Sequence, residues 1–135
     1  MPRKSRQISV DRARANNYIL VAENFDDGAN VAEKYEYWNA AGVLIVHAAI
    51  AYGDAVTIKF GGIKSKGEDH QALVSLIDSL IPESADKKKA ILQLNKIITH
   101  KNSVSYSGDI YGPKDIEQLR KLLDRFSSWV KSVID

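Results

Sequence analysis

The longest apolar stretch of the chain lies at residues 39–60, and the rest of the expected fold is organised around it. Residues 43–51 are apolar almost all the way round a helix, so this helix has no polar face to present to solvent. Such a helix is buried by other elements that pack around it. His47 and Asp54 are its ionisable residues before Lys59, and their spacing places them on one helical face, two turns apart.

Four further segments carry apolar residues at the three- and four-residue spacing of amphipathic helices. The first begins at about Asp11 and has an acidic polar face; its apolar positions are Ala15, Tyr18, Ala22, Phe25, Ala29 and Ala32. The apolar positions of the other three are Leu73, Leu76, Ile77 and Leu80, then Ala90, Ile91, Leu94, Ile97 and Ile98, then Ile116, Leu119, Leu123, Phe126, Val130 and Val133.

Capping and turn signals separate these segments. We expect Asn39 to cap the central helix, the glycine pair at 61–62 to end it, and Ser84 to cap the fourth helix. Pro113 suits the first turn of the last helix, and residues 99–112 remain as a long polar loop, a feature that is often functional. The third helix is expected to start at Glu68 or Asp69. The pattern therefore predicts an all-α antiparallel bundle of about five helices with a long loop before the last helix.

Composition adds limits to this prediction. The 135 residues are enough for one domain with its own core, and 44% hydrophobic and 27% charged residues are typical of a soluble protein. The absence of cysteine excludes disulfides, thiolate zinc sites and cysteine nucleophiles. We expect residues 1–9 to form a flexible basic tail and residues 10–135 a single helical domain. The lysine run at 87–89 is expected to be a solvated helix surface.

Nothing at the N-terminus has the pattern of a signal peptide, and the apolar run at 43–51 is too short to span a bilayer. The expectation is a cytoplasmic protein with no membrane partner.

Several segments, in order and spacing, resemble the HEPN family (higher eukaryotes and prokaryotes nucleotide-binding domain) over nearly the whole chain after Asp11. They are Ala22-Glu23, the run His-Ala-Ala-Ile-Ala-Tyr-Gly-Asp-Ala at 47–55, the run Gly-Glu-Asp-His-Gln-Ala-Leu at 67–73, and residues 122–129 of the last helix. The resemblance implies a helical bundle that is commonly a homodimer. It also implies either a small nucleotidyltransferase as partner, as in systems of the toxin–antitoxin type, or metal-independent RNase activity.

The RNases of that family carry an Arg, four to six variable residues and then a His near the start of the last helix. No Arg of this chain precedes a His at that spacing; Lys101 stands where the Arg would be, and Tyr106 near where the His would be. Lys lacks the planar fork that binds phosphate through two hydrogen bonds, and a phenol with a pKa of about 10 is a poor acid or base at neutral pH. The resemblance therefore implies a non-catalytic module that binds a nucleotide, a nucleic acid or a nucleotidyltransferase, with no cofactor.

Two groups of polar residues are candidate sites. His47, Asp54, Asp69 and His70 would suit acid–base chemistry or a divalent metal if the third helix folded back over the second. They would then serve a degenerate RNase or a hydrolase. The alternative is that His47 is a satisfied core histidine, Asp54 a buried hydrogen-bond anchor and Asp69 a helix cap. No metal site is assigned.

The second group lies in the long loop. Lys101, Asn102 and Tyr106 could hold a phosphate or stack on a base. The alternative is that Asn102 ends the fourth helix and Tyr106 seals the bundle.

Overall fold

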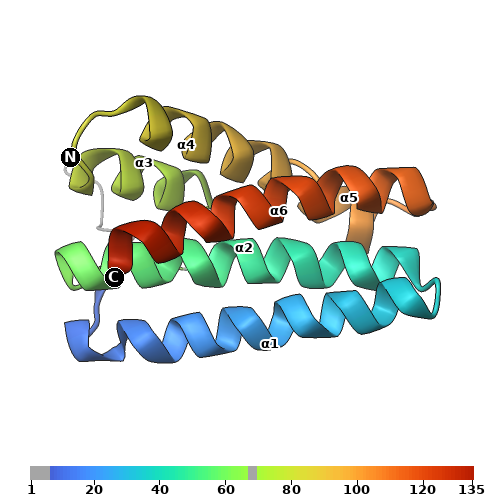
Figure 1. Ribbon diagram of the computed structural model, residues 1–135, viewed down its shortest axis with the longest axis horizontal. Coiled ribbons are helices and arrows are strands. Elements are labelled where there is room, and N and C mark those ends of the chain that lie inside the picture. Colours follow the sequence, from blue (N-terminus) through green and yellow to red (C-terminus); the bar gives the residue numbers. More distant parts are fainter. Residues whose placement is uncertain (1–6, 67–69) are drawn as a thin grey trace, which may run out of the picture.

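The computed structural model describes residues 7–66 and 70–135 (Figure 1). The described elements are β1 (Gln7–Ser9), the short 3-10 helix η1 (Arg12–Arg14), α1 (Ala15–Lys34), α2 (Trp38–Gly61), β2 (Ile63–Ser65), α3 (His70–Leu80), α4 (Ala85–Ile98), α5 (Lys101–Ser105) and α6 (Pro113–Ile134). The predicted all-α bundle is confirmed, with five long helices and a small two-stranded sheet.

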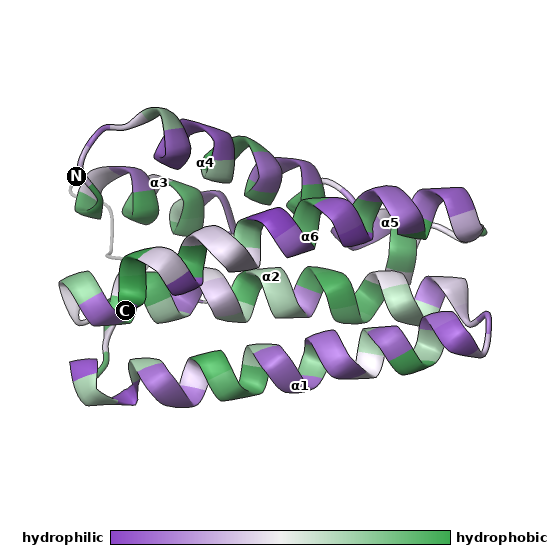
Figure 2. Ribbon diagram, viewed as in Figure 1, coloured by the Kyte–Doolittle hydropathy of each residue, from purple (hydrophilic) through white to green (hydrophobic). Residues whose placement is uncertain are grey.

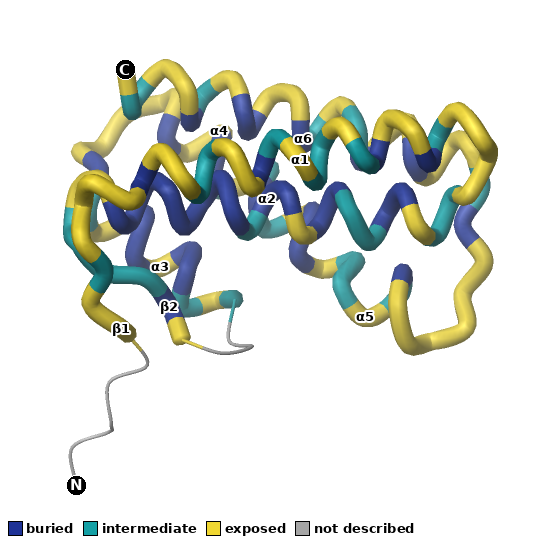
Figure 3. Tube along the Cα trace, turned by 90° about the horizontal axis from the view of Figure 1, so that it is seen from below, coloured by how far each residue is buried: buried dark blue, intermediate teal, exposed yellow. Residues whose placement is uncertain are grey.

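The central helix α2 is the core of the bundle. It packs against α1 on one side and against α3, α4, α5 and α6 on its other sides, and Figure 3 shows most of its length as buried. Figure 2 shows α1 carrying more hydrophilic residues than α2, as expected for an outer helix. The buried state of α2 follows from its apolar circumference, because every face exposed to water would cost free energy.

By length and composition α2 is also the one described helix that could cross a membrane, but 78% of its most apolar window is buried inside the bundle. The core helix of a soluble protein has the same composition, so packing within the bundle accounts for the apolar residues of α2.

The apolar stripes of the outer helices face α2, as predicted. Those of α1 are largely alanine, which allows α1 and α2 to approach closely; Ala22 and Ala29 have no exposed surface. On α6 the stripe from Ile116 to Val130 is buried. The capping predictions for Ser84 and for the glycine pair are also confirmed. The Ser84 hydroxyl accepts the Lys87 N–H at 3.0 Å, and Gly62 ends α2 at a φ of 63°, a conformation that favours glycine.

Three local predictions were wrong. Residues 7–9 of the expected tail form strand β1, which pairs antiparallel with β2, so Gln7 lies opposite Ser65. The expected loop at 99–112 contains the helix α5. Asn39 does not cap α2: the residue at the N-cap position is Tyr37, and the Asn39 side chain forms hydrogen bonds with the backbone of Val104 and Tyr111 instead. The expected start of the third helix at Glu68 or Asp69 lies outside the described residues.

Lys87 also differs from its predicted place on the surface. It is buried, and its ammonium group donates to the backbone carbonyls of Asp78 at 3.1 Å and Ile81 at 3.2 Å. The Asp78 carboxylate lies 2.9 Å away, and its hydrogen bond is the main reason why the pKa of Lys87 is raised. Lys87 thus satisfies carbonyl groups at the end of α3 and joins α3 to α4.

Candidate functional site

A cavity of about 260 Å³ lies where α2, the first turn of α3 and α5 meet. Its lining residues are Val43, Val46, His47, His70, Lys101, Val104, Ser105 and Tyr106. The cavity therefore combines His47 and His70 from one predicted group with Lys101 and Tyr106 from the other. From the sequence alone, these two groups were predicted to be separate sites.

His47 is exposed, so its interpretation as a buried core histidine is wrong. His47 lines the cavity and also contacts Phe25 of α1. The centroids of the imidazole and phenyl rings are 5.6 Å apart. The neighbouring helices leave this position of α2 open, and the imidazole can reach a molecule in the cavity. His70, at the start of α3, is half-buried.

The helix α5 supplies the opposite wall. Lys101 is half-buried, Ser105 is exposed and Tyr106 is 80% exposed, so Tyr106 does not seal the bundle as one interpretation proposed. Valines form the apolar part of the wall; they are Val43, Val46 and Val104. An ammonium group, two imidazoles and two hydroxyls beside an apolar surface are suited to an anion that carries an apolar or aromatic part.

Asn39, in the first turn of α2, holds α5 and the segment after it against α2. Its side-chain amide donates to the carbonyls of Val104 at 3.1 Å and Asp109 at 2.9 Å, and its carbonyl oxygen accepts the Tyr111 N–H at 2.9 Å. Gly42, one turn further along α2, makes room for α5, because a Cβ atom at this position would lie 2.7 Å from Cγ1 of Val104. Both residues position the cavity wall, and neither role could be predicted from the sequence because their partners lie more than sixty positions away.

We expect Asn39→Ala to lower the free energy of unfolding by about 2 kcal/mol, because two partly buried hydrogen bonds that each contribute about 1 kcal/mol are lost, together with a weaker exposed one. Amide hydrogen exchange in residues 101–111 should increase more than exchange in α2. Asn102→Ala is the matched control, since the Asn102 side chain is exposed and only its carbonyl takes part in described hydrogen bonds. Equal protection of α5 in both variants would contradict the role of Asn39.

The remaining predicted residues lie elsewhere. Asn102 does not line the cavity and does not end α4, since it lies inside α5. Asp54 is also absent from the cavity; it is buried, and its carboxylate lies 3.9 Å from the ammonium group of Lys64 on β2. Burial raises the pKa of Asp54 to about 6, although Lys64 opposes the shift. Asp69 lies outside the described residues, so the four-residue site of His47, Asp54, Asp69 and His70 is not assembled in the described structure.

Within residues 7–66 and 70–135, no three His, Asp or Glu side chains come together as potential metal ligands. The described part of the cavity wall therefore offers hydrogen bonds and positive charge rather than a metal-binding set.

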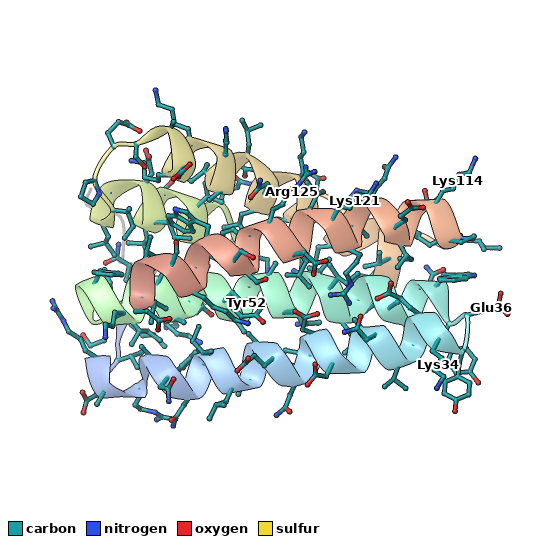
Figure 4. The ribbon with its side chains drawn as sticks, viewed as in Figure 1. Lys34, Glu36, Tyr52, Lys114, Lys121 and Arg125 are labelled. Carbon is teal, nitrogen blue, oxygen red and sulfur yellow. The ribbon has the colours of Figure 1, made fainter. Side chains whose placement is uncertain are left out.

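One polar cluster was missed by sequence analysis. Arg120 of α6 forms ion pairs with Asp26 and with Glu33 of α1, the latter at 2.8 Å, and a longer one of 3.4 Å with Asp124. The Tyr52 hydroxyl donates to Asp26 at 3.3 Å. The pKa of Tyr52 is raised by burial and by the negative charge of Asp26 (Figure 4 shows Tyr52 between α1 and α6).

The acidic polar face of α1 thus contributes two carboxylates to a contact with α6. Burial favours loss of the Arg120 charge, but the hydrogen bonds that the guanidinium donates to Asp26 and Glu33 outweigh this effect and raise the pKa of Arg120. The cluster joins α1 to α6 and does not extend to the cavity residues.

No protein-family model, curated protein or solved structure is significantly similar to this chain.

Proposed function

We propose that this protein is a HEPN-like, non-catalytic module that binds a nucleotide or the end of an RNA strand in the cavity between α2, α3 and α5. The observation that carries the proposal is the meeting of His47, His70, Lys101 and Tyr106 at one cavity. The resemblance of the sequence to the HEPN family supports it independently.

The chemistry of the wall suits one nucleotide unit. The Lys101 ammonium group attracts a phosphate, and an imidazole N–H can donate a hydrogen bond to it; charge-assisted hydrogen bonds to phosphate are about twice as strong as neutral ones. The exposed ring of Tyr106 offers a face on which a base can stack, a contact that contributes about 1–3 kcal/mol. At about 260 Å³ the cavity is slightly smaller than most small-molecule sites, which range from about 300 to 1,000 Å³, so only part of a longer strand would enter it.

The missing Arg-to-His motif is the reason for proposing binding without cleavage. The same proposal includes homodimer formation and a nucleotidyltransferase partner in a system of the toxin–antitoxin type, which the resemblance to the family implies. It also includes a cytoplasmic location, which the absence of cysteine favours.

A second candidate function is cleavage of a phosphodiester bond. Its support is that two imidazoles and an ammonium group line the same cavity, since one imidazole can act as general base and the other as general acid. This version uses His47 and His70 without Asp54, which lies away from the cavity.

Titration with AMP and with a single-stranded RNA of about five nucleotides, with and without Mg²⁺, tests the proposal. We expect binding to the wild-type protein and a loss of affinity of about tenfold in Lys101→Ala, because a charged phosphate contact is removed. Lys34→Ala is the matched control: Lys34 is exposed in the last turn of α1 and does not line the cavity (Figure 4).

Product analysis of the same RNA samples separates the two candidate functions. Intact RNA after prolonged incubation supports the binding module, whereas cleavage that disappears in both His47→Ala and His70→Ala supports the second candidate. Absence of binding to either ligand, or equal affinities of Lys101→Ala and Lys34→Ala, would contradict a phosphate site in this cavity.

A further inference from the structure

A second hollow lies on the surface between α4 and α6, at residues that do not line the cavity described above. Its volume is about 480 Å³, and its lining residues are Lys89, Leu92, Gln93 and Lys96 of α4 with Leu122 and Arg125 of α6. We call these six residues the α4–α6 groove. Figure 4 shows Arg125 between the ribbons of the two helices.

The α4–α6 groove is strongly basic. Lys89, Lys96 and Arg125 are all exposed, and no described carboxylate lies within ion-pair distance of any of them. Arg120, five residues earlier on α6, is by contrast surrounded by carboxylates of its own chain. An exposed Arg without an intramolecular partner retains its planar fork of donors for a carboxylate or phosphate of another molecule.

The groove also has an aliphatic part. Leu92 is 57% exposed and Leu122 is half-buried beside it. Leu92 also borders a neighbouring hollow of about 500 Å³ between α3 and α4, where Val74 and Ile91 contribute further aliphatic surface. Leu92 therefore lies between two hollows, and apolar side chains of a bound molecule could pack against it from either hollow.

We propose that the α4–α6 groove is a docking site for an acidic amphipathic helix of a partner protein. The carboxylates of that helix pair with Lys89, Lys96 and Arg125, and its aliphatic residues pack on Leu92 and Leu122. The cationic residues that α4 contributes to the groove lie at positions 89 and 96, two turns apart, so carboxylates at similar spacing on the partner helix would meet them together.

Two observations favour a peptide over a nucleic acid strand. The groove is lined by leucines and by no aromatic residue, whereas proteins that bind single strands stack bases on aromatic rings. The neighbouring hollow presents Asp78 and Glu83, and these carboxylates would repel phosphates that extended beyond the groove. An amphipathic helix can place its acidic side chains over the groove and its apolar side chains over the neighbouring hollow, whereas a nucleic acid strand carries a negative charge at every phosphate.

Selection from a displayed library of random peptides of about 16 residues, with the full-length protein as bait, tests this proposal. We expect the selected sequences to carry Asp or Glu together with Leu or Ile at three- and four-residue spacing. Synthetic copies should bind Arg125→Glu and Lys96→Glu about tenfold more weakly, because each change replaces an attraction with a repulsion. Lys34→Glu, an exposed charge reversal on α1, should change the affinity by less than about twofold.

A charge-swapped peptide makes the test specific. Replacing one acidic residue of a selected peptide by Lys should restore its binding to Arg125→Glu and weaken its binding to the wild-type protein. Selected peptides without acidic residues, or peptides that bind Arg125→Glu and Lys34→Glu equally well, would overturn the proposal. It would also be overturned if single-stranded RNA of about twelve nucleotides displaced the peptide and itself lost affinity for Arg125→Glu, which would assign the groove to nucleic acid.

Discussion

Arg120→Ala is expected to lower the free energy of unfolding by about 3 kcal/mol, because a partly buried charge cluster loses its cation. The Arg120 and Asp26 side chains are each 16% exposed and that of Glu33 is 23% exposed, so water screens these charges only weakly. Without Arg120 the two carboxylates of α1 would face each other and the hydroxyl of Tyr52 with no cation between them. The contact between α1 and α6 should weaken most.

Urea denaturation at neutral pH measures this effect. Lys121→Ala is the matched control, since Lys121 is the neighbouring cation on α6, is 63% exposed, and pairs with Glu117 at 3.6 Å on the surface. Surface pairs of this kind contribute at most about 1 kcal/mol. Arg120→Lys should give an intermediate loss, because Lys keeps the charge but cannot contact Asp26 and Glu33 through a planar fork. A loss for Arg120→Ala no larger than that for Lys121→Ala would show that the cluster contributes little.

Asp54→Asn is expected to stabilise the protein above about pH 6, with little effect near pH 4. The pKa of Asp54 is about 6 in the folded protein and 3.8 is its ordinary value, so the folded state binds the proton more tightly than the unfolded state. The protonated form is favoured by folding, and the stability that it contributes is therefore lost as pH rises from about 4 to about 6. One pKa unit corresponds to about 1.4 kcal/mol, so the loss reaches at most about 3 kcal/mol.

Unfolding measured at about pH 4.5 and about pH 8 checks the sign. Among the described residues, Lys64 is the charged group that faces Asp54, and one carboxylate oxygen of Asp54 has no described hydrogen-bond partner. The substitution by Asn therefore removes a buried charge and loses only one weak ion pair. Asp27→Asn, a change at an exposed carboxylate of α1, should show no comparable dependence on pH. A destabilised Asp54→Asn protein at about pH 8 would mean that the pair with Lys64 outweighs the burial of the carboxylate.

Periodicity was sufficient to predict the bundle because it reflects burial directly. The apolar circumference of α2 and the stripe from Ile116 to Val130 on α6 could be assigned from spacing alone, and both are buried. The same spacing could not predict which part of α2 its neighbours leave open. The spacing of His47 and Asp54 predicts that they share one face of the helix. In the structure His47 is nevertheless exposed, whereas Asp54 is buried.

The candidate site was predicted only in part because its assembly depends on contacts between distant segments. The sequence pointed to Lys101 and Tyr106 but gave no indication that their segment is helical or that Asn39 fixes it beside α2. The Arg120 cluster was missed for a similar reason. An acidic helix face has the same pattern whether it meets water or an arginine from another helix.

The measurement that tests the proposed function most directly is the NMR titration of the His47 and His70 imidazole signals with AMP. If the cavity binds a phosphate, both imidazole signals should shift in a saturable way with the same dissociation constant, while the His100 signal should remain unchanged because that ring is engaged by the Tyr111 hydroxyl at 2.5 Å. Lys101→Ala should require more AMP for the same shift. Saturable binding of AMP that leaves the signals of both His47 and His70 unchanged would contradict the assignment of this cavity as the nucleotide site.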